Sequence, residues 1–475
     1  MIGAVAMSSD ERTTMTQTQW RTPDDIRADF SAAMSHMYRT EVPLYGELLD
    51  IVHSVNAATL QRTPELAARL KAAGEADRLD SERHGAIRVG TAAELAMLRR
   101  AFAVMGMAPV GYYDLSLAGV PVHATAFRPT TQAALNRNPF RVFTSLVRLE
   151  LIEDEDLRRR SAELLSDRQI FTAGAIELIA LFERQGGLGD ADAARFVAEI
   201  LETFRWHGDA RVDAATYDRL HAAHRLIADV VSFRGPHINH LTPRTLDIDA
   251  AQAEMLARGI RAKAVIEGPP RRAVPILLRQ TSFTALQETV RFSGNETAGT
   301  HSARFGEIEQ RGAALTPAGR ELYDRLLAAA RGGDGSQASD YPARLADAFG
   351  AFPDDEDALR EQKLAYFHYS ATGKAAPVGD RGDTADLSGL LAAGAVQATP
   401  IVYEDFLPVS AAGIFQSNLG GGEQKAYSGA AAQEAFEQAL GAPVADPFAL
   451  YAQMEQASVS AVLAQVRGAA GGSGG

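Results

Sequence analysis

Two histidines and one glutamate, in three well-separated segments of the sequence, carry side chains that can bind one metal ion together. His84 lies in RHGAIRVG, His240 in INHLTPRT and Glu307 in RFGEIEQRG, and each segment is typical of a β-strand. Strand side chains alternate between two faces, so these groups can point to a common centre. Two histidines and one carboxylate form the facial triad of non-haem iron enzymes, which leaves coordination positions open for substrate and O2.

An arginine in the first of these segments adds a candidate substrate contact. His84, Ala86 and Arg88 lie on one face of the predicted strand. Ile87 and Val89 lie on the other, and this apolar face is expected to pack on helices. The Cα atoms of His84 and Arg88 are about 13 Å apart in an extended strand. A guanidinium there can hold one end of a ligand by a carboxylate while the other end reaches the metal, although a structural ion pair is the alternative role.

Other residues compete for these positions. Glu309 projects from the same strand face as Glu307 and can take the carboxylate position in its place. His237 competes with His240, but it lies at the entrance of the strand, where a supporting or surface role is more typical. Two further histidines are candidates for supporting or substrate contacts, His123 and His301.

The composition excludes several classes of site and partner. The 475 residues include no cysteine, which excludes disulfides, thiolate zinc sites, iron–sulfur clusters and cysteine nucleophiles. A formal net charge of −13 argues against a nucleic-acid-binding surface. No apolar run approaches the ~18 residues of a membrane helix, and the N-terminus lacks the basic start of a signal peptide. We therefore expect a cytoplasmic protein without nucleic-acid or membrane partners.

The elements that must position the candidate ligands form a repeated pattern. Residues 81–150 predict a strand, an amphipathic helix after a threonine cap, and then further short strands. Residues 233–330 repeat this βαβββ order, with His240 in the place of His84, and add a helix. The long period of the repeat indicates a duplicated domain rather than a solenoid. The predicted fold class is α+β, with two βαβββ modules that form a curved sheet around the metal.

The other segments predict helices and flexible termini around these modules. Apolar spacing predicts helices over 23–80 and over a large insertion at 151–232. Residues 331–465 begin with a Gly/Ser-rich stretch and are expected to form a C-terminal cap. Residues 1–22 are expected to be disordered, and 466–475 to form a flexible tail.

Several long segments resemble one known family. FSAAMSHMYRTEVPLYGELLDIV, FRGPHINHLTPRTLDID, RFGEIEQRGAALTPAGR and YEDFLPVSAAGIFQSNL resemble the 2-oxoadipate dioxygenase/decarboxylase family, also called 2-hydroxyglutarate synthase, over about residues 25–460. The strand–helix repeat resembles the vicinal-oxygen-chelate superfamily, in which paired βαβββ modules enclose a metal. The stretch GEIEQRG also resembles the last strand of 4-hydroxyphenylpyruvate dioxygenase, where the first glutamate is an iron ligand.

The resemblance implies an activity and assigns residues to it. The implied enzyme uses Fe(II) to convert 2-oxoadipate and O2 to (R)-2-hydroxyglutarate and CO2 in lysine catabolism, by decarboxylation and then intramolecular hydroxylation. The implied iron ligands are His84, His240 and Glu307. The residues implied to contact the substrate are His84, Arg88, His240, Val409 and Ser410.

Two other kinds of function fit the same modules. Another 2-oxo acid dioxygenase, or a glyoxalase-like metal isomerase, is one alternative, and the isomerase needs a fourth protein ligand. The first module offers no clear matching glutamate near PVHATAF. A non-enzymatic small-molecule binder is the other alternative, and it needs neither inward histidines nor a metal. The metal content of the purified protein separates these possibilities.

Overall fold

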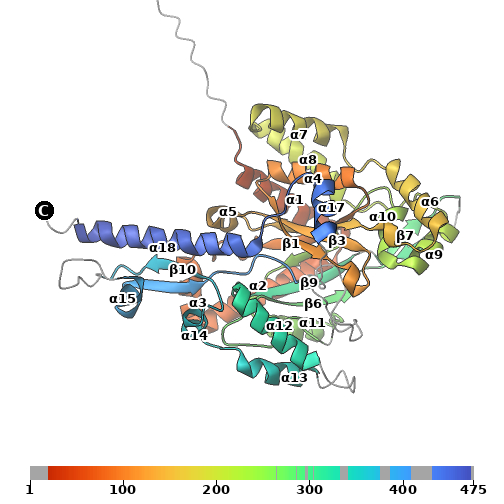
Figure 1. The fold of residues 1–475 in the computed structure, drawn as a ribbon. Helices are drawn as coiled ribbons and strands as arrows, with labels where there is room; N and C mark the ends of the chain where they lie inside the picture. Colours follow the sequence, from red (N-terminus) through yellow and green to blue (C-terminus); the bar gives the residue numbers. More distant parts are fainter. Residues whose placement is uncertain are drawn as a thin grey trace, which may run out of the picture.

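The computed structural model of the protein describes residues 20–263, 265–284, 286–294, 298–302, 304–331, 341–374, 386–407 and 430–471. Figure 1 shows the helices and strands of these residues, arranged around a central curved sheet. The predicted α+β class is confirmed. Among the described residues, no helix is both long and apolar enough to cross a membrane.

The first module is a sheet with one long helix beside it. Its elements are β1 (Arg83–Val89), α4 (Ala92–Val104), β2 (Ala108–Asp114), β3 (Val122–Arg128), α5 (Gln132–Arg137) and β4 (Arg141–Val147). The strand order is β2-β3-β4-β1-β5, with β1 parallel to β4 and the other neighbours antiparallel. The predicted threonine cap is Thr91, which forms a reciprocal capping box with Glu94 at the start of α4. The short helix α5 was not expected from the sequence.

The second module completes the curved sheet. Its elements are β5 (Leu241–Pro243), α11 (Ile248–Ala257), β6 (Leu278–Thr284), β7 (Glu288–Arg291), β8 (Ala298–His301) and β9 (Phe305–Arg311). β5 pairs with β1, so one sheet includes strands of both modules, while β6 with β9 and β7 with β8 form two separate two-stranded sheets. A parallel bridge between Arg244 and Glu309 then joins the end of β5 to β9, and Thr245 N donates to Glu309 O at 2.7 Å. This continuity brings the strands of all three candidate ligands together.

Helices cover both faces of the shared sheet. The N-terminal helices are α1 (Pro23–Glu41), α2 (Leu44–Arg62) and α3 (Pro64–Ala72), and those between the modules are α6 (Glu155–Ser166), α7 (Ala173–Gln185), α8 (Asp190–Leu201), α9 (Ala214–Ala223) and α10 (Arg225–Ser232). Ile87 and Val89 of β1 pack with apolar residues of α1, α4, α7 and α8, as expected for their face. Ala86, on the opposite face, packs with residues of α9 and α10.

The C-terminal part forms a second apolar core beside the sheet. Its elements are α12 (Pro317–Arg331), α13 (Tyr341–Ala348), α14 (Glu356–Glu361), β10 (Phe367–Ala371), α15 (Leu387–Ala392), β11 (Val396–Pro400), α17 (Ala430–Leu440) and α18 (Pro447–Gly471). This core also includes Ile276 and Leu315 of the second module, so the two parts are packed together. Helix α17 is the exception, because its Phe436 and Leu440 belong to the apolar core that contains Ile87 and Val89. In Figure 1, α18 is the long helix at the C-terminal end. The helix extends to Gly471, whereas a flexible tail was expected from residue 466 onward, and Val466 is buried in the core.

Candidate metal centre

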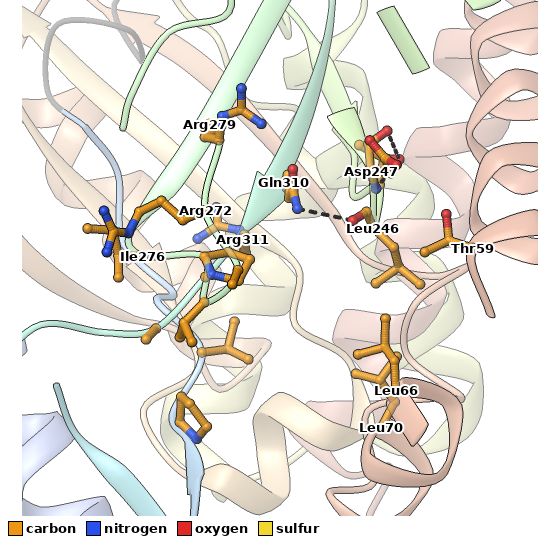
Figure 2. A pocket seen from close by; sticks show the side chains of 18 of the residues that line it. Thr59, Leu66, Leu70, Leu246, Asp247, Arg272, Ile276, Arg279, Gln310 and Arg311 are labelled. Carbon is orange, nitrogen blue, oxygen red and sulfur yellow. Dashed lines mark hydrogen bonds between the residues drawn. The ribbon is translucent and has the colours of Figure 1, made fainter. Parts of the chain in front are cut away.

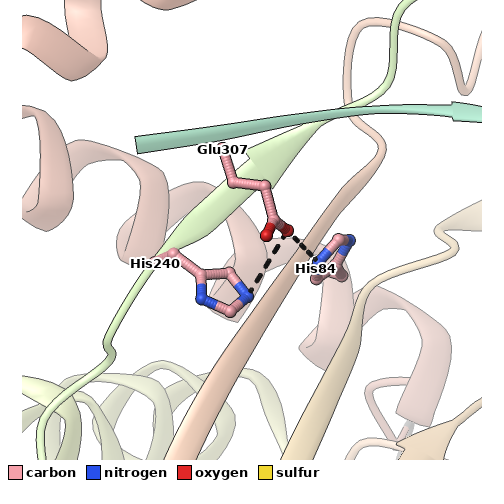
Figure 3. Close-up of side chains that lie close together, drawn as sticks. All are labelled: His84, His240 and Glu307. Atoms are coloured by element: carbon pink, nitrogen blue, oxygen red, sulfur yellow. Dashed lines mark hydrogen bonds and ion pairs between the residues drawn. The ribbon is translucent and has the colours of Figure 1, made fainter. Parts of the chain in front are cut away.

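Three buried side chains from three segments converge at the centre of the curved sheet (Figure 3). His84 Nε2 lies 3.1 Å from Glu307 Oε1, and His240 Nε2 lies 3.8 Å from the same oxygen. One ligand atom from each of the three residues lies within 4.8 Å of the others. All three side chains are fully buried. This is the group of residues that the strand patterns predicted from the sequence.

Backbone hydrogen bonds fix the three segments relative to each other. His84 is opposite Thr242 in the pairing of β1 with β5. The segment before β5 lies between the other two strands, because Asn239 N donates to Ala86 O at 2.9 Å and Phe305 N donates to Asn239 O at 3.1 Å. His240 is therefore held by the backbones of both β1 and β9, next to His84 and Glu307.

The unpaired atoms at this centre fit a metal ion. Within the part of the chain that the structure describes, neither ring nitrogen of His240 has a hydrogen-bond partner, and neither does Glu307 Oε2. Buried polar atoms of this kind are costly unless they bind another group. Burial lowers the pKa of His240 to about 4, so its imidazole is neutral at pH 7, the form that binds metals. His84, His240 and Glu307 can therefore hold a metal.

Two side chains hold one oxygen of the candidate carboxylate ligand. Thr242 Oγ1 donates to Glu307 Oε1 at 2.9 Å, and Gln280 Nε2 donates to the same oxygen at 3.0 Å. These contacts set the orientation of the carboxylate and direct its other oxygen away from them. Such outer contacts orient metal ligands in proteins and tune the metal that they bind.

Glu309, the competitor of Glu307, lies on the opposite side of the His84 ring. Its Oε2 is 3.0 Å from His84 Nδ1, whereas Glu307 faces Nε2 of the same ring. Arg311 donates two hydrogen bonds to Glu309, at 2.8 and 2.9 Å. Burial by itself raises the pKa of Glu309, but Arg311 and His84 outweigh it and keep this pKa below the ordinary value. Glu309 is thus a charged partner of His84, and of the two glutamates it is Glu307 that belongs to the candidate ligand group.

Further buried ion pairs support Glu309 from behind. Arg141 lies 3.4 Å from Glu309 and 2.6 Å from Glu404. Glu404 also accepts a hydrogen bond from Arg78 at 2.7 Å, and Arg78 pairs in turn with Glu82 at 3.2 Å. Positive and negative side chains alternate along this series of ion pairs, so each buried charge has opposite charges beside it. The network gives Glu309 a fixed position and thereby fixes the ring of His84.

Substitution of Glu309 by glutamine is expected to weaken metal binding by roughly 10- to 100-fold, because an outer-shell contact of a histidine ligand is lost. The glutamine keeps the shape of the side chain but removes the charge that faces His84 Nδ1. Competition titration with a chelator measures the affinity for Co(II) or Zn(II). Glu404→Gln is the comparison variant, because Glu404 reaches His84 only through Arg141 and Glu309, so its removal should weaken metal binding less. Equal weakening in both variants would contradict an orienting role for Glu309.

Arg88 lies further along β1, and α10 provides its partner. Arg88 Nη1 donates to Asp229 Oδ2 at 2.9 Å, and both side chains are buried. The structure thus contains the ion pair that was the alternative role of Arg88, on the same strand face as His84. Val409 and Ser410, the other expected substrate contacts, lie outside the described residues.

Aromatic rings close the space around the two histidines. The Phe406 ring lies 4.9 Å from the His84 ring, and the Phe305 ring lies 4.7 Å from the His240 ring. Both histidines are fully buried, and the two rings cover these sides of the centre against water. Sequence reasoning did not identify Phe406, Gln280 or Asp229. Thr242 was the only one of these contacts that strand alternation indicated, because a residue two positions from His240 lies on the same face of a strand.

A separate cavity of about 580 Å³ lies away from the candidate ligands (Figure 2). Its lining includes Leu246, Asp247, Gln310 and Arg311 but none of His84, His240 and Glu307. Gln310 Nε2 donates to Leu246 O at 3.0 Å across its wall. Because none of the three candidate ligands lines it, this cavity is not the space next to the metal ligands.

Comparisons with known proteins identify relatives over almost the whole chain. The family described as 2-oxoadipate dioxygenase/decarboxylase matches residues 30–418. A Pseudomonas putida protein named 2-oxoadipate dioxygenase/decarboxylase is 61% identical over 446 residues, which cover 92% of this chain and 96% of that protein. An Escherichia coli protein of the same name is 59% identical over 442 residues, which cover 92% of this chain and 97% of that protein.

A solved structure is similar over the same extent. The crystal structure of the hydroxyglutarate synthase from Pseudomonas putida in complex with 2-oxoadipate matches with a TM-score of 0.88 and 58% identity. The match covers 94% of this chain and 99% of that chain. The arrangement of both modules and of the C-terminal part is therefore shared with that protein.

Proposed function

The chain belongs to the 2-oxoadipate dioxygenase/decarboxylase family, and we propose that it uses Fe(II) to convert 2-oxoadipate and O2 to (R)-2-hydroxyglutarate and CO2. The observation that carries the proposal is the buried group of His84, His240 and Glu307, in which one ligand atom of each residue lies within 4.8 Å of the others. Two imidazoles and one carboxylate are the donor set of non-haem Fe(II) oxygenases. The reaction balances without another reductant, because oxidative decarboxylation of the substrate supplies the electrons for hydroxylation of the same molecule.

The three ligands would hold the metal at one end of the bound substrate, and their neighbours would keep the ligands in position. Iron, when bound by His84, His240 and Glu307, supplies the redox chemistry and the open coordination positions that a 2-oxo acid and O2 require. Thr242 and Gln280 hold Glu307 in place, and Glu309 holds His84. This fixed arrangement means that little reorganisation is needed when the substrate binds.

Arg88 would bind the other end of the substrate. 2-Oxoadipate carries a second carboxylate beyond a chain of three CH2 groups, and a guanidinium on the same strand face as His84 can pair with it. The pairing would orient one C–H bond of the chain toward the reacting centre, which fixes the (R) configuration and the preferred chain length. The buried ring of Phe406 and the half-buried ring of Phe305 would keep water away from the reacting groups.

Oxygen consumption with 2-oxoadipate tests this function. Protein loaded anaerobically with Fe(II) should consume one O2 and release one CO2 for each (R)-2-hydroxyglutarate formed. Removal of the metal with a chelator should abolish turnover, and Fe(II) should restore it. Full turnover by metal-free protein, or O2 consumption without formation of 2-hydroxyglutarate, would overturn the proposal.

The alternative of a glyoxalase-like isomerase receives no support from the centre itself. Such an enzyme needs a fourth protein ligand, whereas the group of candidate ligands in the described residues has the three members His84, His240 and Glu307. Three protein ligands leave the open positions that a chelating substrate and O2 need.

A further inference from the structure

Asp229 stands at the centre of a buried cluster beside the candidate substrate arginine. Its Oδ2 accepts a hydrogen bond from Arg88 Nη1 at 2.9 Å, and its Oδ1 lies 3.0 Å from His301 Nε2. His237 Nε2 lies 3.5 Å from the same Oδ1. Asp229 is 7% exposed, and His237 and His301 are 3% and 6% exposed. The two oxygens of this carboxylate therefore have different partners: Oδ2 faces Arg88, and Oδ1 faces the histidines.

The neighbours of the two histidines fix the cluster in place. Tyr217 Oη lies 2.7 Å from His301 Nδ1, so both nitrogens of that ring are held. The Trp206 ring packs edge-on against the His237 ring, with centroids 4.8 Å apart, and lies parallel to the His301 ring at 6.2 Å. Because these contacts come from α9, β8 and the segment after α8, the carboxylate of Asp229 cannot turn without disturbing several elements.

The charge of Asp229 suits it to hold a guanidinium. Burial by itself raises the pKa of Asp229, but the hydrogen bond with His301 and the positive charge of Arg88 outweigh this effect and lower the pKa. An ionised carboxylate forms shorter and stronger hydrogen bonds with a guanidinium than a neutral group does. The Arg88 side chain has many rotamers in the absence of such a partner, so the pairing restricts the plane and direction of its guanidinium.

We propose that Asp229 is a positioning residue, held by His301, that fixes the guanidinium of Arg88 to receive the distal carboxylate of the substrate. The inference rests on the proposed function, in which Arg88 binds that carboxylate. Asp229 does not touch the reacting atoms, and it acts on them through Arg88. It therefore contributes to the preference for dicarboxylic over monocarboxylic 2-oxo acids.

A second role for the same contact predicts the opposite result. If Asp229 competed with the substrate for Arg88, its removal would strengthen substrate binding and lower KM. If it positions Arg88, its removal weakens binding of the distal carboxylate and raises KM. The direction of the change in KM thus separates the two roles.

Steady-state kinetics of Asp229→Asn tests the inference. The KM for 2-oxoadipate should rise roughly 10- to 100-fold, the range for loss of a hydrogen bond to a charged group, with a smaller change in kcat. The kcat/KM for 2-oxohexanoate, which has the same chain length but no distal carboxylate, should stay close to the wild-type value. Asp249→Asn is the control, because Asp249 lies on α11, pairs with the buried Arg279 of β6 and touches no residue of the cluster. Its KM should be that of the wild type.

His301→Gln provides a second variant in case Asp229→Asn folds poorly. This change keeps the carboxylate of Asp229 but removes its contact with the imidazole, so KM should rise in the same direction by a smaller factor. An unchanged or lowered KM in a folded Asp229→Asn variant, or in His301→Gln, overturns the positioning role. A wild-type protein that does not turn over 2-oxoadipate overturns the proposed function itself, and the positioning role with it.

Discussion

Replacement of Glu307 by alanine is expected to abolish turnover of 2-oxoadipate, with a loss of roughly a thousandfold or more. The change removes the only carboxylate of the candidate ligand group and leaves two buried imidazoles to hold a dication. Metal ions in enzymes contribute several kcal/mol to stabilisation of the transition state, and about 4 kcal/mol corresponds to a thousandfold in rate. Oxygen uptake measures the rate, and elemental analysis of the same samples measures the bound metal.

The same strand provides a control for the effect of Glu307→Ala. Gln310→Ala removes a side chain from the opposite face of β9, where it donates to Leu246 O at 3.0 Å. This variant should lose some stability but retain its metal and its turnover per bound iron. A Glu307→Ala variant with wild-type metal content and turnover would contradict the ligand assignment.

Replacement of Arg88 by alanine should impair selection of the substrate more than the chemistry itself. A site built to bind a polar group rejects an analogue that lacks this group, and this rejection is lost when the binding residue is removed. We expect the ratio of kcat/KM for 2-oxoadipate over 2-oxohexanoate to fall by roughly a hundredfold or more. The fall should arise mainly from a higher KM for 2-oxoadipate.

Loss of Arg88 also leaves Asp229 buried without its guanidinium partner, so thermal unfolding has to accompany the kinetics. Arg279→Ala is the matched control, because it removes a buried arginine from another aspartate pair away from the ligand group. A folded Arg88→Ala variant that discriminates between the two substrates as the wild type does would exclude the clamp role.

Local patterns were sufficient to predict the elements that carry the candidate ligands. The alternation in β1 separates Ile87 and Val89, which pack in one apolar core, from Ala86 in another. The threonine cap and amphipathic spacing predict α4, because both features depend on residues close in sequence. The matching positions of His84 and His240 in two repeated modules then led to the buried group that the structure contains.

Alternation was less informative where the chain is not a regular strand. Ile238 would share a face with His240 if the strand extended to both residues, but β5 begins only at Leu241. Ile238 instead packs against Gly85, on the face of β1 that is opposite to His84. The irregular backbone before β5 therefore places two side chains on different faces, which a periodic pattern does not predict.

Contacts between distant segments could not be predicted from local patterns. Gln280 reaches Glu307 only because β6 pairs with β9, and Asp229 reaches Arg88 only because α10 packs on β1. The choice between Glu307 and Glu309 is of the same kind. Both project from one face of β9, and it is the position of His84 between them, with Arg311 behind Glu309, that assigns their roles.

The central claim is that one iron ion binds between His84, His240 and Glu307, and anomalous diffraction at the iron absorption edge tests it most directly. Crystals grown anaerobically with Fe(II) should give one strong peak, at roughly 2.1 Å from a nitrogen of each histidine and from an oxygen of Glu307. The same crystals soaked with 2-oxoadipate should keep this peak, with the distal carboxylate beside Arg88. A peak bound by other residues, or no peak at this centre in fully active protein, would contradict the account.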